Sequence, residues 1–277
     1  MIFTLNEEIH LPSCLDSLSW CDDVIVVDSF STDKSEDVCR QRGITFVQHA
    51  FENLASQRNW ALDTLPIRHE WVLILDADER VPMELVAEMH GAIGRAPAKV
   101  AAFRLCRRLH LWGRWLKYSS LYPTWIVRLI RKDRVRYFVS GHGESQDVDG
   151  EIRGLKTALI DENLKGIDEW FARQNRYSHK EAEYEYEQSG KGDIFSNLLS
   201  NNPLRRRVGL KRLASSMPAR GLLFFLYSYI WKRGFLDGRD GFVFCVMRSI
   251  YQTMIAIKKY DLKRLAAFET KTKSDET

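Results

Sequence analysis

The sequence predicts an α/β protein whose first half is built on a parallel β-sheet. Three observations support this prediction: short runs rich in β-branched residues recur, helical segments separate them, and acidic residues follow two of the runs. Runs that are apolar throughout are typical of strands buried on both faces, and in parallel sheets such strands alternate with helices. The length of 277 residues suits one large domain or two small ones.

Each element of the first half follows from a local signal. The predicted strands, all short and apolar, span 23–28, 44–48, 71–75 and 101–105. The predicted helices span 31–42, 53–65 and 82–93. Ser31 to Asp33 supply an N-terminal cap for the first helix, and Gly43 is a natural stop at its end. Pro66 terminates the second helix.

Polar residues follow three of the expected strands. Asn6 and Glu7 come after the first apolar residues, Asp28 ends the second strand, and Asp76 and Asp78 follow the strand at 71–75. Ligands of parallel sheets bind at the carboxyl ends of the strands, so we expect these side chains along one rim. Two carboxylates on one turn suit a divalent cation and its phosphate ligands.

The composition excludes several classes of protein. Hydrophobic residues make up 45% and charged residues 28% of the chain, which excludes a disordered or collagen-like protein. The five cysteines lack paired spacing, so neither a disulfide framework nor a zinc site is predicted, and a reducing compartment fits best. No signal peptide is recognised at the first residues, and no apolar run reaches the roughly 18–20 residues of a membrane span.

Charge alternates along the chain. The net charge is −9 over residues 1–103, +9 over 104–136, −6 over 137–202 and +10 over 203–277. We expect an acidic, metal-binding core beside basic surfaces that meet anions such as phosphate esters or lipid headgroups. Ordinary solvated faces are the alternative interpretation.

The basic segment 104–136 interleaves arginines with aromatic residues. This mixture suits a phosphorylated sugar, because rings stack on sugar faces and guanidinium groups bind phosphate. Single-stranded nucleic acid is recognised by similar mixtures, but no nucleic-acid-binding module accompanies this one, so we expect no nucleic acid. The acceptor-binding candidates are Arg114, Trp115 and Arg128.

Four segments, at residues 4–8, 26–33, 57–61 and 75–79, form an ordered set of motifs. The set resembles the family 2 inverting glycosyltransferases of GT-A fold, and most of all their lipopolysaccharide core β-glucosyltransferase group. The resemblance continues through 113–115, 122–123, 128–129 and 142–144, and faintly through 234–238. It implies a Rossmann-like, mostly parallel sheet with flanking helices, followed by a helical, amphipathic C-terminal extension.

The resemblance implies a nucleotide-sugar donor, expected to be a UDP-sugar, and roles for the residues of the rim. Asn6 and Glu7 would lie in the first nucleotide loop, and Asp28 would hold the uracil or other base. Arg58 would lie near the nucleotide phosphates, while Asp76 would face the ribose or the sugar.

It also implies a metal and a catalytic base. Asp78 would ligate Mg²⁺ or Mn²⁺ that bridges the diphosphate. Inverting transfer needs a carboxylate that takes the proton of the acceptor hydroxyl, and Glu144 is our candidate. Asp147 and Asp149 are the neighbouring alternatives. His142 could be a metal or diphosphate ligand, or a structural histidine.

The expected acceptor is a glycolipid, such as a lipopolysaccharide core. A polyprenyl-phosphate-linked acceptor and a non-catalytic nucleotide-sugar-binding protein remain alternatives.

The chain departs from the family pattern at its start, because only Met1 to Phe3 precede the first motif; this predicts a clipped strand and suggests a misplaced start codon. The expected domains are 1–165, 166–264 and a disordered tail at 265–277.

Basic clusters flank the apolar runs of the C-terminal part. This pattern is typical of helices that lie in an anionic headgroup layer, and it predicts peripheral attachment to the inner face of the cytoplasmic membrane. A helical hairpin packed on the catalytic domain is the alternative, and both can hold together. The basic residues are Arg205 to Arg207, Lys211, Arg212, Arg220, Lys232, Arg233, Lys258 and Lys259. The residues expected to insert are Phe224, Phe225, Tyr229 and Trp231.

Overall fold

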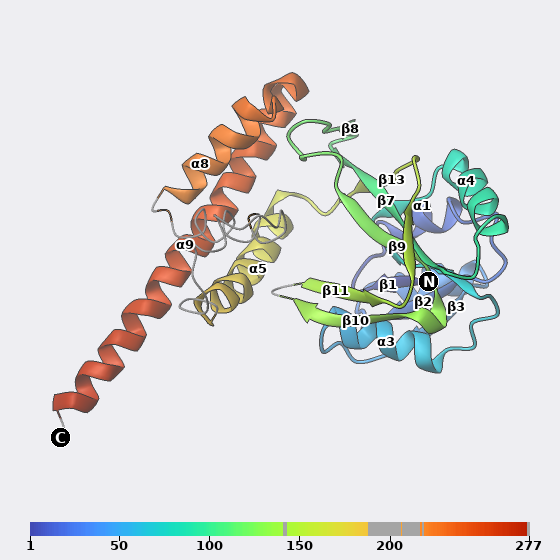
Figure 1. The fold of residues 1–277 in the computed structure, drawn as a ribbon, viewed down its shortest axis with the longest axis horizontal. Coiled ribbons are helices and arrows are strands. Elements are labelled where there is room, and N and C mark those ends of the chain that lie inside the picture. The colour runs from blue at the N-terminus through green and yellow to red at the C-terminus, as the bar shows by residue number, and fades with distance from the viewer. Residues whose placement is uncertain (141–142, 188–205, 207–216, 218, 276–277) are drawn as a thin grey trace. The chain divides into compact units, whose positions relative to one another are not determined.

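A computed structural model describes residues 1–140, 143–187, 206, 217 and 219–275 of the chain (Figure 1). The chain forms two compact units, Met1–Gly166 and Ile167–Thr277. His142 lies outside the described residues, as do Arg205, Arg207, Lys211 and Arg212.

The first unit contains the predicted parallel sheet, so the α/β fold class is confirmed. Four parallel strands lie in the order β3-β2-β1-β5. They are β1 (Ile2–Thr4), β2 (Ile25–Asp28), β3 (Thr45–Gln48) and β5 (Leu75–Asp76). All residues of β2 are buried, which is why this strand reads as a continuous apolar run.

Helices cover both faces of this sheet. They are α1 (Leu11–Asp16), α2 (Ser35–Gln41), α3 (Leu54–Thr64) and α4 (Met83–Gly94). Val26 packs into a core with residues of α1, α2 and α4, whereas Ile25 and Val27 pack with Ala61 of α3. The cap of α3 is Asn53, whose side chain accepts a hydrogen bond from the Ser56 N–H at 2.8 Å.

A second sheet of the first unit is mixed. Its strands are β4 (Trp71–Leu73), β6 (Glu79–Arg80), β7 (Val100–Leu111), β8 (Arg114–Trp115), β9 (Trp125–Arg131), β12 (Glu151–Gly154) and β13 (Leu159–Glu162). The long β7 is central, because β9, β13, β12 and β8 all pair with it. After β9 and the short 3₁₀ turn η1 (Lys132–Arg134), β10 (Val135–Ser140) and β11 (Gly143–Val148) form an antiparallel pair.

The predicted strand at 71–75 is divided between the two sheets, so its prediction as one strand is wrong. β4 pairs antiparallel with β9, and β5 pairs parallel with β1. The crossing occurs at Ile74, whose N–H donates to Arg128 O at 2.8 Å, while the next N–H, of Leu75, donates to Met1 O at 3.0 Å. The acidic turn that follows therefore leaves from the junction of the two sheets.

The turn between β11 and β12 depends on a glycine. Gly150 has a φ of +143°, and a Cβ there would lie 2.7 Å from Lys99 O and 2.9 Å from the Ala101 Cβ. Gly150→Ala is expected to lower the free energy of unfolding by about 1–3 kcal/mol, because backbone strain and a steric clash coincide. Thermal unfolding followed by circular dichroism measures the change.

Gly154→Ala provides the matched control. A Cβ at Gly154 would meet the Trp125 ring at 3.6 Å, an ordinary van der Waals contact. This variant is expected to stay within about 0.5 kcal/mol of the unchanged protein. Equal melting temperatures for the two variants would contradict the prediction.

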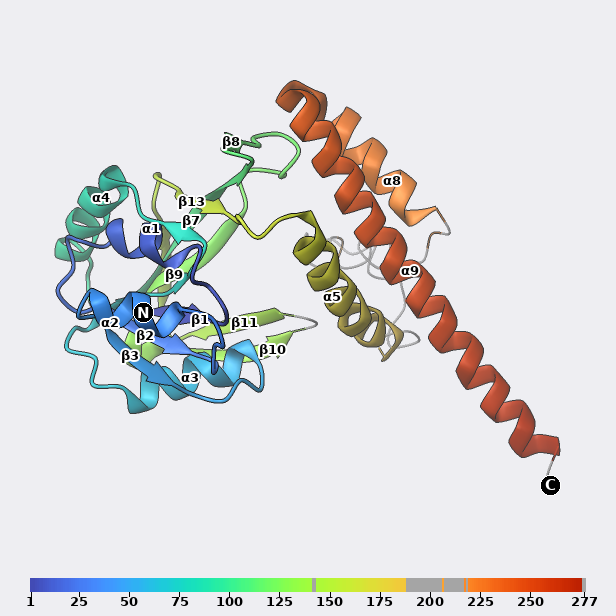
Figure 2. The ribbon, with the colours of Figure 1, turned by 180° about the vertical axis from the view of Figure 1, so that it is seen from behind.

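The second unit is helical. It contains α5 (Ile167–Glu187), α8 (Arg220–Leu226), the π-helical turn η2 (Tyr227–Trp231), the 3₁₀ turn η3 (Gly234–Asp237) and α9 (Gly238–Asp275). α8 runs beside α9 (Figure 2). The Glu185 carboxylate of α5 accepts hydrogen bonds from Arg220 at 2.9 Å and from Lys259 at 3.3 Å. Among the described residues, no helix is long and apolar enough to cross a membrane.

The structure differs from the expectation of a disordered tail at 265–277. α9 continues through the first part of that segment and ends at Asp275. The physical reason is composition: after Gly241 the chain has neither glycine nor proline, so nothing stops the helix.

Candidate active site

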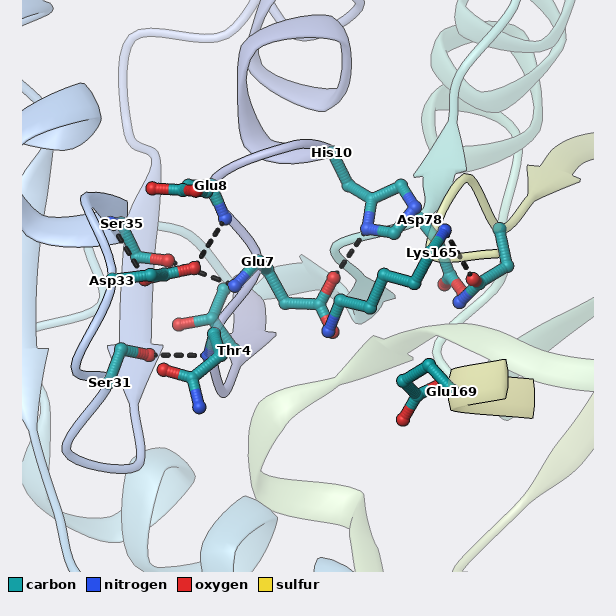
Figure 3. A network of polar contacts seen from close by, with 12 residues as sticks. Thr4, Glu7, Glu8, His10, Ser31, Asp33, Ser35, Asp78, Lys165 and Glu169 are labelled. Carbon is teal, nitrogen blue, oxygen red and sulfur yellow. Dashed lines mark hydrogen bonds and ion pairs between the residues drawn. The ribbon is translucent and has the colours of Figure 1, made fainter. Parts of the chain in front are cut away.

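Two loops lie side by side at the carboxyl ends of β1 and β2. The Asn6 N–H donates to the Ser31 hydroxyl at 2.7 Å, and the Thr32 N–H donates back to Asn6 Oδ1 at 2.8 Å. The Glu8 N–H donates to Asp33 Oδ2 at 2.9 Å (Figure 3). Asn6 has a φ of +55°, a conformation that asparagine tolerates better than most residues. Asn6 thus fastens the two loops to each other.

Asp28 is completely buried beneath these loops. Its carboxylate accepts hydrogen bonds from Thr4 Oγ1 at 2.9 Å and from the Ser31 N–H at 2.8 Å, and also from the Ser31 hydroxyl. Both carboxylate oxygens are therefore engaged within the protein, and Asp28 sets the shape of the loop through Ser31. Its contact with a nucleotide base stays a prediction.

Glu7 is held from two sides. His10 Nδ1 lies 2.5 Å from Glu7 Oε2, and Lys165 Nζ lies 2.6 Å from Oε1 (Figure 3). The Leu164 N–H donates to His10 Nε2 at 2.7 Å, so the proton of this histidine is assigned to Nδ1, which donates to Glu7. Sequence analysis missed His10 and Lys165. The spacing of His10 three residues after Glu7 is a weak local signal, and Lys165 has none.

Asp78 occupies a strongly acidic position. Its Oδ2 accepts a hydrogen bond from Asn163 Nδ2 at 3.2 Å. Burial, together with the like charges of Asp76 and Glu7, raises the pKa of Asp78. Within the described ranges, no lysine or arginine forms an ion pair with Asp78. The neighbourhood therefore favours the approach of a cation.

Asp76 has the opposite environment, although it is only two residues away. Its Oδ1 lies 3.1 Å from an Arg58 nitrogen and its Oδ2 lies 2.5 Å from an Arg128 nitrogen. Burial alone would raise its pKa, but the Arg128 and Arg58 guanidiniums outweigh burial and hold the pKa of Asp76 well below its usual range. Asp76 is thus a permanent carboxylate, while Asp78 lacks such compensation.

Arg58 connects Asp76 to Glu144. Its side chain is 3% exposed, with its guanidinium carbon 5.5 Å from the centre of the Phe3 ring and 5.4 Å from that of Tyr137. One nitrogen pairs with Glu144 Oε1, and another pairs with Asp76. Arg58, predicted beside the phosphates, is in this structure the link between the acidic turn and the candidate base.

Glu144 lies on β11, opposite Val139 of β10. Burial raises the pKa of its carboxyl group, and Arg58 opposes this effect. Oε2 is buried and has no hydrogen-bond partner among the residues that the structure describes. Of the two carboxylate oxygens of Glu144, Oε1 is thus paired with Arg58 and Oε2 lacks a partner among the described residues.

Arg128 requires a correction. It was predicted to bind the acceptor, but it is 5% exposed, and its guanidinium binds Glu79 at 2.7 Å as well as Asp76. Glu79, fully buried, also accepts the Asp76 N–H at 3.0 Å. Arg128 and Glu79 therefore fix the acidic turn from within the protein. Sequence analysis did not single out Glu79, although it directly follows Asp78.

The contacts continue into an alternating row of charges. Arg107 lies 3.7 Å from Glu79 and 3.0 Å from Asp161. Burial, with Asp78 nearby, raises the pKa of Asp161 to about 7. We call the row the charge chain; it consists of Glu144, Arg58, Asp76, Arg128, Glu79, Arg107 and Asp161.

Arg114 and Trp115 form the short strand β8. The Trp115 ring lies 5.0 Å from the Arg108 guanidinium and meets the Tyr122 ring edge-on at 5.4 Å, while Arg114 is exposed. The preceding turn is tied to the acidic rim, because the Gly113 N–H donates to Glu162 Oε1 at 2.9 Å and the Glu162 N–H donates to Asp78 O.

A family model, Glycosyl transferase family 2, matches residues 1–162, which is almost all of the first unit. The chain belongs to this family. It is therefore a nucleotide-sugar glycosyltransferase, and the family and GT-A fold predicted from the ordered motifs are confirmed.

The chain is similar to several known proteins over most of its length. It is 26% identical over 273 residues to the lipopolysaccharide core biosynthesis glycosyltransferase LpsC of Rhizobium meliloti, covering 96% of this chain and 93% of that one. An uncharacterized glycosyltransferase of Rickettsia felis is also 26% identical, with 87% and 82% of the two chains covered. Glucosyl-3-phosphoglycerate synthase from Mycobacterium tuberculosis, solved with Mg²⁺ and UDP, is 18% identical with a TM-score of 0.45, covering 66% of this chain and 77% of that one.

Proposed function

We propose that this glycosyltransferase moves a hexose from a UDP-sugar to a lipopolysaccharide core or related glycolipid, with inversion at the anomeric carbon. The similarity to LpsC over 96% of the chain supports the class of acceptor. The observation that carries the reaction type is the pairing of Glu144 and Asp76 through Arg58, which places a buried carboxylate oxygen beside the acidic turn.

Glu144 acts as the general base in this proposal. Its Oε1 is held by Arg58, so the orientation of the carboxylate is fixed and Oε2 takes the proton of the acceptor hydroxyl. The acceptor oxygen forms a bond to the anomeric carbon while the bond from that carbon to the diphosphate oxygen breaks. A single displacement of this kind inverts the anomeric centre.

The donor set of the rim fits a divalent cation. In the part of the chain that the structure describes, no group of three His, Cys, Asp or Glu residues could hold a metal alone. Mg²⁺ is commonly held by one or two carboxylates together with substrate phosphates, which matches Asp78 beside the repelling charges of Asp76 and Glu7. Asp78 would hold Mg²⁺ or Mn²⁺, which would neutralise charge on the leaving diphosphate.

The loop contacts give the remaining residues their roles toward the donor. Asn6 and Asp28 hold the loop that covers the nucleotide, each through Ser31. Glu7 keeps Lys165 at the same rim, where its ammonium group is close to an incoming diphosphate. Asp76, ionised by its two arginines, accepts hydrogen bonds from ribose or sugar hydroxyls.

The test is an assay of UDP release and product formation with purified protein. The protein is incubated with a panel of UDP-sugars, with purified core oligosaccharide as acceptor and with Mn²⁺ or Mg²⁺. We expect UDP release that depends on one sugar and on the acceptor, and that stops when EDTA removes the metal.

Three other outcomes would contradict separate parts of this proposal. Transfer only to a polyprenyl-phosphate-linked acceptor would overturn the acceptor class. Full activity in EDTA would overturn the metal. Donor binding without turnover on any acceptor would indicate a nucleotide-sugar-binding protein.

A further inference from the structure

The second unit carries an apolar face that points to solvent. Its residues belong to α8, η2 and η3, and the most exposed are Leu222 at 60%, Ile230 at 58% and Trp231 at 79%. We call this surface the outer face; its members are Leu222, Leu223, Leu226, Tyr227, Ile230, Trp231, Phe235 and Leu236, each more than 40% exposed. In a folded protein, a group of large apolar side chains exposed in this way marks an interaction site.

The segment from α8 to η3 places its small residues against α9 and its large apolar residues outward, the reverse of an ordinary amphipathic helix. Its inner side consists of small residues: Ser228 is fully buried, and a Cβ on Gly221 would lie 2.0 Å from Thr253 Oγ1 of α9. A Cβ on Gly234 would lie 2.8 Å from Ser228 O. Glycine and serine thus allow close contact with α9, while the large aliphatic residues are left outside, opposite to the pattern of a helix in water.

The aromatic residues divide between the two sides, which corrects the expected insertion. Phe225 and Tyr229 stack on each other at 5.2 Å, and both meet the ring of Phe242 on α9. They and Phe224 are only partly exposed. Of the four residues expected to insert, Trp231 alone lies on the outer face, and the others support it from beneath.

Cations border the outer face. Lys232 and Arg233 follow Trp231 directly and are exposed, as is Arg239. No acidic residue occurs between positions 219 and 236, and the next one, Asp237, is 4% exposed. Exposed aliphatic and indole side chains with exposed cations beside them are typical of segments that lie in a lipid headgroup layer.

We propose that the outer face seats in the headgroup layer of an anionic membrane, with α8 and η2 parallel to its plane. Together Arg220–Leu226 and Tyr227–Trp231 are too short to span the hydrocarbon core, so the segment can only lie in the interface. The border of positive charge favours a lipid surface over a protein partner, whose interface would need acidic groups in register. The proposal is independent of sugar transfer, because it concerns binding alone.

The experiment is flotation of the full chain with vesicles, in the absence of donor and acceptor. Vesicles of phosphatidylcholine are compared with vesicles that contain 30% phosphatidylglycerol, at low and at high salt. We expect binding to the anionic vesicles only, falling about tenfold or more as salt rises, because exposed charges are screened.

Two sets of variants test the surface itself. Leu226→Ser with Ile230→Ser and Trp231→Ser should lower vesicle binding about 10²-fold, since three large apolar side chains are lost. Ile257→Ser with Tyr260→Ser is the matched control, because both residues are exposed on α9 outside the outer face, at 62% and 70%. This control should bind as the unchanged protein does.

Several results would overturn the proposal. They are failure to bind any vesicle, equal binding to neutral and anionic vesicles at all salt concentrations, and equal loss in both sets of variants. Self-association of the unchanged protein that the triple variant abolishes, without vesicle binding, would assign the face to a second copy. If the unchanged protein bound anionic vesicles but released no UDP with any donor and acceptor, the proposed function would be contradicted and the membrane inference would stand.

Discussion

Asp78→Asn is expected to lower the rate of sugar transfer by about 10³-fold while the protein remains folded. The substitution keeps the shape of the side chain and an oxygen that can accept from Asn163, but it removes the charge that would hold the cation on the diphosphate. A metal ion contributes several kcal/mol of charge stabilisation in the transition state, and about 4 kcal/mol corresponds to this factor. Turnover at saturating donor, measured over a range of Mn²⁺ concentrations, gives the result.

Stability separates this effect from unfolding. Because burial and like charges raise the pKa of Asp78, the fold disfavours its ionised form, and a neutral asparagine should not lower the melting temperature. Glu8→Gln is the matched control. Glu8 is an exposed carboxylate of the same rim whose Oε2 accepts the Lys34 N–H at 2.9 Å, so transfer should remain near normal. An Asp78→Asn enzyme with normal rate and metal dependence would show that Asp78 holds no metal.

Glu144→Gln is expected to lower turnover by about 10²-fold or more and to leave the affinity for the donor unchanged. Glutamine preserves the size of the side chain and a carbonyl oxygen for Arg58, but it cannot take a proton. Turnover and the dissociation constant of the donor are measured separately. Asp147→Asn, on the exposed side of the same strand, is the control, and it should be active. If Asp147→Asn lost turnover and Glu144→Gln kept it, Asp147 would be the base.

The pH dependence provides a second measurement of Glu144. A general base acts only when it is deprotonated, so the rate falls as pH falls through its pKa. Because burial raises that pKa, the acid limb of the pH–rate profile should lie at higher pH than for an ordinary glutamate. In Glu144→Gln the pH–rate profile of the residual activity should no longer show this acid limb. An unchanged acid limb in the variant would assign it to another group.

Local sequence signals were sufficient for the parallel sheet and its rim. The β-branched run of β2, the cap at Asn53 and the acidic turn after a buried strand each depend on neighbours along the chain. The register of β1 with β2 and β5 then brings Thr4 opposite Asp28 and Phe3 opposite Asp76. Parallel pairing by itself brings the carboxyl ends of these strands to one edge of the sheet, which is why the rim could be predicted, whereas the register could not.

Pairing between distant segments could not be predicted in the same way. The apolar run at 71–75 does not reveal that its two ends join different sheets, because hydrophobicity does not specify the partner strand. Arg128 looks like its basic neighbours in sequence, and only the carboxylates of Asp76 and Glu79 explain its burial. The residues that make up the outer face could not be predicted for a related reason: the apolar run does not show which side packs on α9, and Gly221, Ser228 and Gly234 decide this.

The charge chain has an evolutionary consequence. Its carboxylates alternate with arginines, and each interior member forms ion pairs with the two members beside it. Loss of one member leaves a buried charge without its partner, which costs more than the loss of a complete pair. The effects of substitutions in the charge chain are therefore not additive, and a substitution is tolerated when a second one restores a partner for the remaining charge. Evolutionary change at these positions is therefore expected to occur as paired substitutions and not one residue at a time.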